Sequence, residues 1–215
     1  EIVSRDWSSD VCSSDLQLEY LVARGALGPE YRDAAAAYRE ALAALPAQLP
    51  EGEATEFPAG AWPCVSGVCN RLVHFSDAAA IPGGALDPAL DRRAVEAAWQ
   101  RQAAGFTVLD GLLAPAAVAP LRRFCVESTF WFDARPAAGC VGASLEEGFI
   151  CPLLVQVATE LRQALPRIFR FERLLGLKAC KYDDSIDGAG GQEDPAAVEF
   201  SLWIPPAESG RPSYE

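Results

Sequence analysis

Residues 183–194 form the densest cluster of side chains in the sequence that could bind a metal ion. This stretch, DDSIDGAGGQED, contains Asp183, Asp184, Asp187, Glu193 and Asp194. Carboxylate oxygens are the ligands that calcium prefers, but their spacing here differs from that of an EF-hand loop. A solvated acidic turn between two strands explains the same residues, and the residues taken alone favour that interpretation.

His74, in the stretch NRLVHF, is the only histidine in the chain. Any Ser-His-Asp or Cys-His catalytic arrangement would have to use this one imidazole, and no nucleophile-elbow motif lies nearby. Its apolar neighbours Val73 and Phe75 favour a packing role over a catalytic one. The sequence also contains no phosphate-binding glycine motif, because the GAGG at 188–191 lacks the helix that such a motif needs.

The seven cysteines do not form a metal-binding pattern. Cys64 and Cys69 lie close together, but no second pair of Cys or His residues follows at the spacing of a zinc site. Four later cysteines lie among apolar residues, where thiols behave as small, buried hydrophobic side chains. They are Cys125, Cys140, Cys151 and Cys180. We therefore expect a reducing, cytoplasmic environment.

The charge balance excludes two classes of partner. The formal net charge is -12 and the pI is about 4.6, whereas nucleic acids and anionic membranes attract basic surfaces. Hydrophobic residues make up 50% of the chain, which is enough to bury a core. No stretch is long and apolar enough to cross a membrane. We expect a globular protein that binds neither nucleic acid nor membranes.

The beginning of the chain has an unusual pattern. The stretch DWSSDVCSSDL at positions 6–16 repeats Ser-Ser-Asp around a Val-Cys pair and has no helical or strand period. Reverse-translated from Trp7 onward, it reads TGG AGT TCA GAC GTG TGC TCT TCC GAT CT, which looks like a sequencing-library adapter read in frame. We expect residues 1–16 to be a disordered artefact that replaces the true N-terminus.

A helical pattern runs from Gln17 to Leu45, and Pro29 opens its second half. Apolar side chains recur at spacings of three and four in that half and form one face. The segment YRDAAAAYREALAALP resembles the second helix of a tetratricopeptide repeat, but an amphipathic helix packed on a globular domain is the commoner explanation. We expect a helical segment at 17–48 and a linker, rich in Pro, Gly and Glu, at 49–69.

Three further helices are predicted from helical periods at 91–104, 115–132 and 151–169, with Asp91 as the N-cap of the first. The third predicted helix has one apolar face. Its residues are Leu154, Val157, Leu161 and Leu165.

Strand-like runs gather in the second half of the chain. FTVLDGLL begins at Phe106, LLGLKACKY ends at Tyr182, and AAVEFSLWI covers 196–204. Because helices come first and strands follow, we expect an α+β domain whose sheet is cut short at Glu215.

Two blocks of sequence resemble a known superfamily. These blocks are GFTVLDGLLAPAAVAPLRRFCVESTFWFD, from Gly105, and LKACKYDDSIDGAGGQEDPAAVEFSLWIPP, from Leu177. Their order and wording resemble those of 2-oxoglutarate- and iron(II)-dependent dioxygenases, and more narrowly the prolyl-hydroxylase-like members attached to tetratricopeptide repeats. The resemblance implies that residues 70–215 are the N-terminal part of an oxygenase-like domain. It would hold an incomplete double-stranded β-helix, or jelly-roll, flanked by helices.

The family binds iron through a His-x-Asp pair and a later His, and a basic residue anchors 2-oxoglutarate. The resemblance places the metal-binding aspartate at Asp194 and the first histidine position at Gln192, whose neutral amide is a poor substitute for imidazole. It also places Tyr182 at an aromatic position that touches 2-oxoglutarate in some members. The distal histidine and the basic residue are expected many residues after Ile204, beyond Glu215.

The resemblance implies a fragment of an oxygenase that is inactive as written. Iron(II) and 2-oxoglutarate would be cofactors of the parent protein, and we expect this chain to bind neither. The substrate stays open. The alternative is a non-catalytic oxygenase-like or helical-repeat protein-binding module, because one substitution at a ligand position is typical of a retired active site. An unrelated α+β domain is the third interpretation.

Overall fold

The computed structural model describes residues 2–3, 14–44, 55–56, 63–101, 107–135, 140–169, 171–182 and 198–204. The chain divides into two units. Unit 1 draws on residues 1–77, 123–151 and 176–192, and unit 2 draws on residues 78–122, 152–175 and 193–215. Each unit therefore combines segments that are far apart in the sequence.

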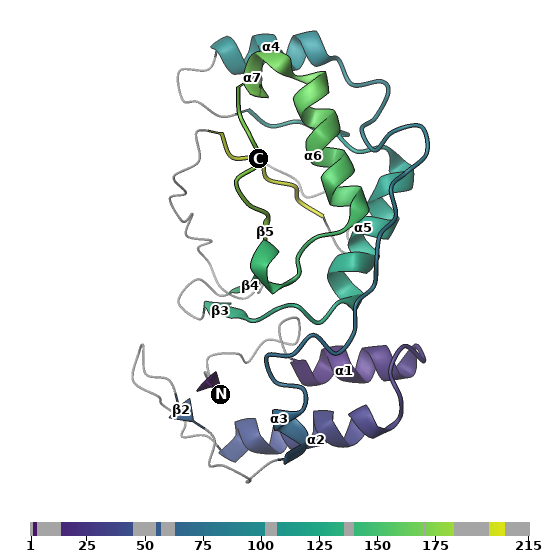
Figure 1. The fold of residues 1–215 in the computed structure, drawn as a ribbon, viewed down its shortest axis with the longest axis vertical. Coiled ribbons are helices and arrows are strands. Elements are labelled where there is room, and N and C mark those ends of the chain that lie inside the picture. Colours follow the sequence, from purple (N-terminus) through teal and green to yellow (C-terminus); the bar gives the residue numbers. More distant parts are fainter. Residues whose placement is uncertain are drawn as a thin grey trace, which may run out of the picture. The chain divides into compact units, whose positions relative to one another are not determined.

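Unit 1 begins with two helices, α1 (Ser14–Ala23) and α2 (Glu30–Ala44), which pack side by side (Figure 1). Leu18 of α1 belongs to the same buried cluster as Ala35 of α2. Gly25 follows α1 at a φ of 72°, in the left-handed region that glycine adopts readily, and this turn ends the helix. The prediction of one continuous helical pattern is therefore wrong.

Part of the segment that was expected to be disordered is ordered. Residues 14–16 form the first turn of α1, where the buried Asp15 carboxylate lies 3.3 Å from Nη1 of Arg39. Strand β1 (Ile2–Val3) pairs antiparallel with β2 (Thr55–Glu56). The expected disorder is wrong at these positions, because an ion pair and strand pairing hold them. The adapter origin of the segment stays a prediction.

The second part of the predicted linker 49–69 belongs to the helical core. Helix α3 (Pro63–Ser66) places Val65 against α2, where Val65 and Cys69 are buried in one cluster with Ala41. The hydroxyl of Tyr38 lies 3.7 Å from Sγ of Cys69. The linker prediction is therefore wrong for these residues, because packing against α2 outweighs their local preference for loops.

The sheet of unit 1 has three antiparallel strands in the order β3-β4-β5. They are β3 (Asp133–Arg135), β4 (Cys140–Ser144) and β5 (Lys178–Tyr182), and a short 3-10 turn (Leu145–Glu147) follows β4. Strand β5 confirms the strand that was predicted to end at Tyr182. Strands β3 and β4 were not predicted, because the sequence DARPAAGCVGAS is rich in small residues and lacks a period of two.

Aromatic side chains form the core of unit 1. The ring of Phe124 lies 5.0 Å from that of Phe130, 5.6 Å from Phe149 and 5.7 Å from Phe75, measured between centroids. Phe124 and Phe130 are fully buried. These edge and tilted contacts join the end of α5 (Pro115–Glu127) to the loop segments that contain Phe75, Phe130 and Phe149.

Unit 2 contains α4 (Arg92–Arg101), the first part of α5, α6 (Pro152–Ala164) and α7 (Pro166–Phe169). The predicted apolar face of α6 is confirmed, since Leu154, Val157, Leu161 and Leu165 are all buried. The predicted single helix at 151–169 is wrong, because Pro166 lacks a backbone donor and begins a new helix.

Of two further predictions for unit 2, one is confirmed and one is wrong. The N-cap is confirmed, since Oδ1 of Asp91 accepts a hydrogen bond from the Ala94 amide at 3.0 Å. The run from Phe106 forms no strand over its described residues 107–113, where Leu113 makes only an isolated bridge to Leu86.

Two more predicted elements, a helix and a strand, also differ from the structure. Helix α5 ends at Glu127 rather than at 132, because the hydroxyls that follow bind other backbone segments. The run predicted as a strand at 196–204 has no strand over its described residues 198–204. Helices and antiparallel strands together nevertheless confirm the α+β class.

Candidate functional site

The residues that the resemblance assigns to iron lie outside the described part of the chain. These residues are Gln192 and Asp194. The acidic stretch 183–191 also lies outside the described part. Tyr182 is the last residue of β5, and its backbone pairs with that of Cys140 in β4. The structure therefore fixes the place of Tyr182 in the sheet, while its contact with 2-oxoglutarate stays a prediction.

His74 is half-buried, and a buried threonine holds its backbone in place. Oγ1 of Thr129 accepts hydrogen bonds from the amides of Val73 at 2.9 Å and of His74 at 3.0 Å. The Thr129 amide donates in turn to the His74 carbonyl at 3.0 Å. These bonds tie a loop segment to the end of α5, and the role of the His74 imidazole stays a prediction.

Further polar contacts around the end of α5 extend this arrangement. Oγ of Ser128 accepts a hydrogen bond from the Ser76 amide at 3.0 Å, and the Ser76 hydroxyl donates to Oε2 of Glu127 at 3.0 Å. Oε1 of Glu127 lies 3.2 Å from Nε of Arg24. Glu127 therefore joins the turn after α1 and the 73–76 segment to α5.

Gln17 of α1 caps the same helix end. Its Nε2 donates to the carbonyl of Val126 at 2.9 Å and to that of Ser128 at 2.8 Å. The last carbonyl groups of a helix receive no hydrogen bond from an N–H group of the helix itself. A side-chain donor such as Gln17 satisfies them instead. Sequence analysis did not single out this glutamine, because its partners lie more than a hundred residues away, as the separation of 109 to Val126 shows.

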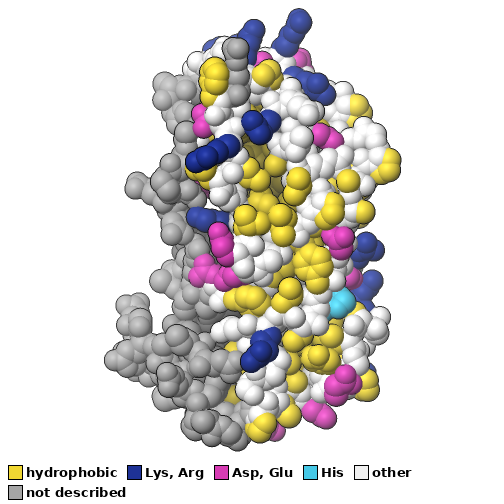
Figure 2. All heavy atoms as spheres, in the orientation of Figure 1, with side chains coloured by type: hydrophobic (Ala, Val, Ile, Leu, Met, Phe, Trp, Pro, Cys, Tyr) yellow, Lys and Arg dark blue, Asp and Glu magenta, His cyan; other side chains and the backbone are white. Residues whose placement is uncertain are grey.

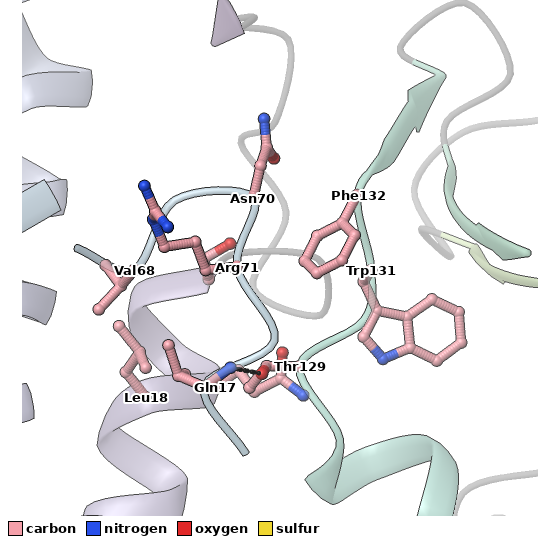
Figure 3. A pocket seen from close by; sticks show the side chains of 10 residues that line it. Gln17, Leu18, Val68, Asn70, Arg71, Thr129, Trp131 and Phe132 are labelled. Atoms are coloured by element: carbon pink, nitrogen blue, oxygen red, sulfur yellow. Dashed lines mark hydrogen bonds between the residues drawn. The ribbon is translucent and has the colours of Figure 1, made fainter. Parts of the chain in front are cut away.

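A small hollow lies beside these contacts in unit 1. Figure 3 shows Gln17 and Thr129 at its base, with Asn70 and Arg71 across from Phe132. The cavity measures about 30 Å³, whereas sites for small molecules usually measure about 300 Å³ or more. It has room for little more than one water molecule. This hollow is therefore too small to be a preformed substrate pocket.

The indole ring of Trp131 contacts both the Lys181 ammonium group and the backbone of Cys125. Nζ of Lys181 lies 4.2 Å from the ring centroid of Trp131, whose Nε1 donates to the Cys125 carbonyl at 3.1 Å. Burial raises the pKa of the Cys125 thiol to about 11. A thiol is a nucleophile chiefly as the thiolate, so Cys125 is expected to be a poor nucleophile at neutral pH.

The predicted burial of the later cysteines is confirmed only in part. Cys151 is buried and Cys125 is half-buried, as expected from their apolar neighbours. Cys180 is exposed, because it lies on β5, the last strand in the order of this sheet.

The residues of the chain do not fit the iron site that the resemblance implies. That site needs two histidines, and the single histidine lies in the loop segment whose backbone Thr129 fixes. Within the described ranges, no group of three or more His, Cys, Asp or Glu side chains is placed to hold a metal ion.

Figure 2 shows Lys and Arg side chains dispersed among hydrophobic and acidic ones on the face drawn, without a continuous basic patch among the described residues there. None of the helices in the described part of the chain is long and apolar enough to cross a membrane.

No family model, curated protein or solved structure matches the chain. The comparisons therefore assign the chain to no family.

Proposed function

We propose that the chain is the N-terminal part of a 2-oxoglutarate- and iron(II)-dependent oxygenase-like protein, and that its 215 residues do not themselves catalyse oxidation. The observation that carries the proposal is the order of elements. Helix α5 precedes the antiparallel strands β3 and β4, α6 lies between β4 and β5 in the chain, and β5 ends at Tyr182, ten residues before Gln192. In this proposal, β3, β4 and β5 belong to a double-stranded β-helix.

The absence of activity follows from the ligand chemistry of the proposed site. Iron(II) in such enzymes is held by two imidazoles and one carboxylate, which leave open positions for 2-oxoglutarate and dioxygen. Asp194 supplies the carboxylate, but Gln192 supplies only a neutral amide, and no second histidine accompanies His74. We therefore assign no step of an iron-dependent reaction to the residues of this chain.

An assay of succinate release tests the catalytic half of the proposal. The purified chain is incubated with 2-oxoglutarate, iron(II), ascorbate and dioxygen, and succinate is measured against a reaction without protein. We expect no succinate above this background. Turnover that depends on iron(II) and on the chain would contradict the proposal.

Sequencing tests the half that concerns the parent protein. The locus is amplified from genomic DNA with primers outside both ends of the coding region, and codon 192 is read. We expect codon 192 to encode His and the frame to continue to a distal His and a basic residue. A confirmed Gln192 in a frame without these residues would contradict an oxygenase parent.

That second outcome would favour the other candidate function, a non-catalytic protein-binding module. The observation in its favour is Gln192 itself, because one amide at a ligand position, beside a retained Asp194, is what a retired metal site contains. The residue encoded at codon 192 therefore distinguishes the two candidate functions.

A further inference from the structure

We draw no further inference here: the strongest candidate, the surface patch of unit 1 in which the exposed apolar side chains of Leu72 and Phe75 lie along the loop segment 72–75, carries none, because nothing in the described part of the chain shows what covers it.

Discussion

Glu160 of α6 holds a loop segment of unit 2 through its carboxylate. The Ala85 amide donates to Oε2 at 2.9 Å, the Leu86 amide donates to the same atom at 3.0 Å, and Nε2 of Gln156 donates to Oε1 at 2.8 Å. Gln156 also accepts from the amide of Ile81 and donates to its carbonyl. One face of α6 thus satisfies the backbone of residues 81–86, which form no helix or strand of their own.

The cost of removing this acceptor follows from the two backbone donors. Ala85 and Leu86 are buried, so Glu160→Ala leaves their amides without an acceptor. A buried donor without a partner costs about 1–3 kcal/mol. Gln156 keeps its bonds to Ile81. We therefore expect Glu160→Ala to lower the free energy of unfolding by about 2–4 kcal/mol, and Glu160→Gln, which keeps one acceptor oxygen, by about half as much.

Urea denaturation, followed by circular dichroism, measures these free energies. Gln163→Ala on the same helix is the control, because its side chain is exposed, and it should change stability by less than about 0.5 kcal/mol. Hydrogen exchange should show faster exchange at the amides of Ala85 and Leu86 in the Glu160 variants. If Glu160→Ala unfolds at the same urea concentration as the control, the reasoning is refuted.

The pH dependence of stability gives a second measurement of the same contact. Burial disfavours the charge of Glu160, but hydrogen bonds from Leu86, Gln156 and Ala85 outweigh it and lower the pKa of this carboxyl group. The stabilisation is therefore complete above the unfolded-state pKa of about 4.3 and is lost as the pH falls through the lower folded-state value. The difference between native chain and Glu160→Gln should be constant near pH 7 and shrink in acid.

Two more predictions concern unit 1. Gln17→Ala should lower the free energy of unfolding by about 1–2 kcal/mol, because two carbonyls at the end of α5 lose their donor; urea denaturation measures this, and an unchanged midpoint would contradict the capping role. The half-buried Cys125, with a pKa raised to about 11, should react with a disulfide reagent at pH 8 far more slowly than the exposed Cys64. Equal rates in single-cysteine variants of the folded chain would contradict this, and unfolding should abolish the difference.

Sequence periodicity predicted those parts of the fold that local patterns control. The apolar face of α6 lies at the expected residues, because apolar side chains recur there with the helical period of 3.6 residues. The Asp91 cap has an equally local cause. The linker at 49–69 was mispredicted for Val65 and Cys69, because their burial depends on α2, which no local pattern reveals.

The site residues were less predictable than the fold. Tyr182, Gln192 and Asp194 came from a resemblance, and only the backbone of the first lies in the described part of the chain. The roles of Thr129 and Gln17 depend on partners across large separations, such as the 55 residues between Thr129 and His74. Threonine and glutamine are common surface residues, so their types give no signal of such roles.

The contacts of α1, which precedes the tetratricopeptide-like helix α2, favour one of two interpretations of that segment. A repeat helix packs only on neighbouring repeats, but α1 caps the end of α5 through Gln17 and reaches Glu127 through Arg24. Glu127 in turn accepts from Ser76, so three segments of unit 1 depend on one another. The structure thus favours an amphipathic helical pair that belongs to a globular domain. If the chain is a binding module, it therefore binds partners through a surface other than the side of α1 that faces α5.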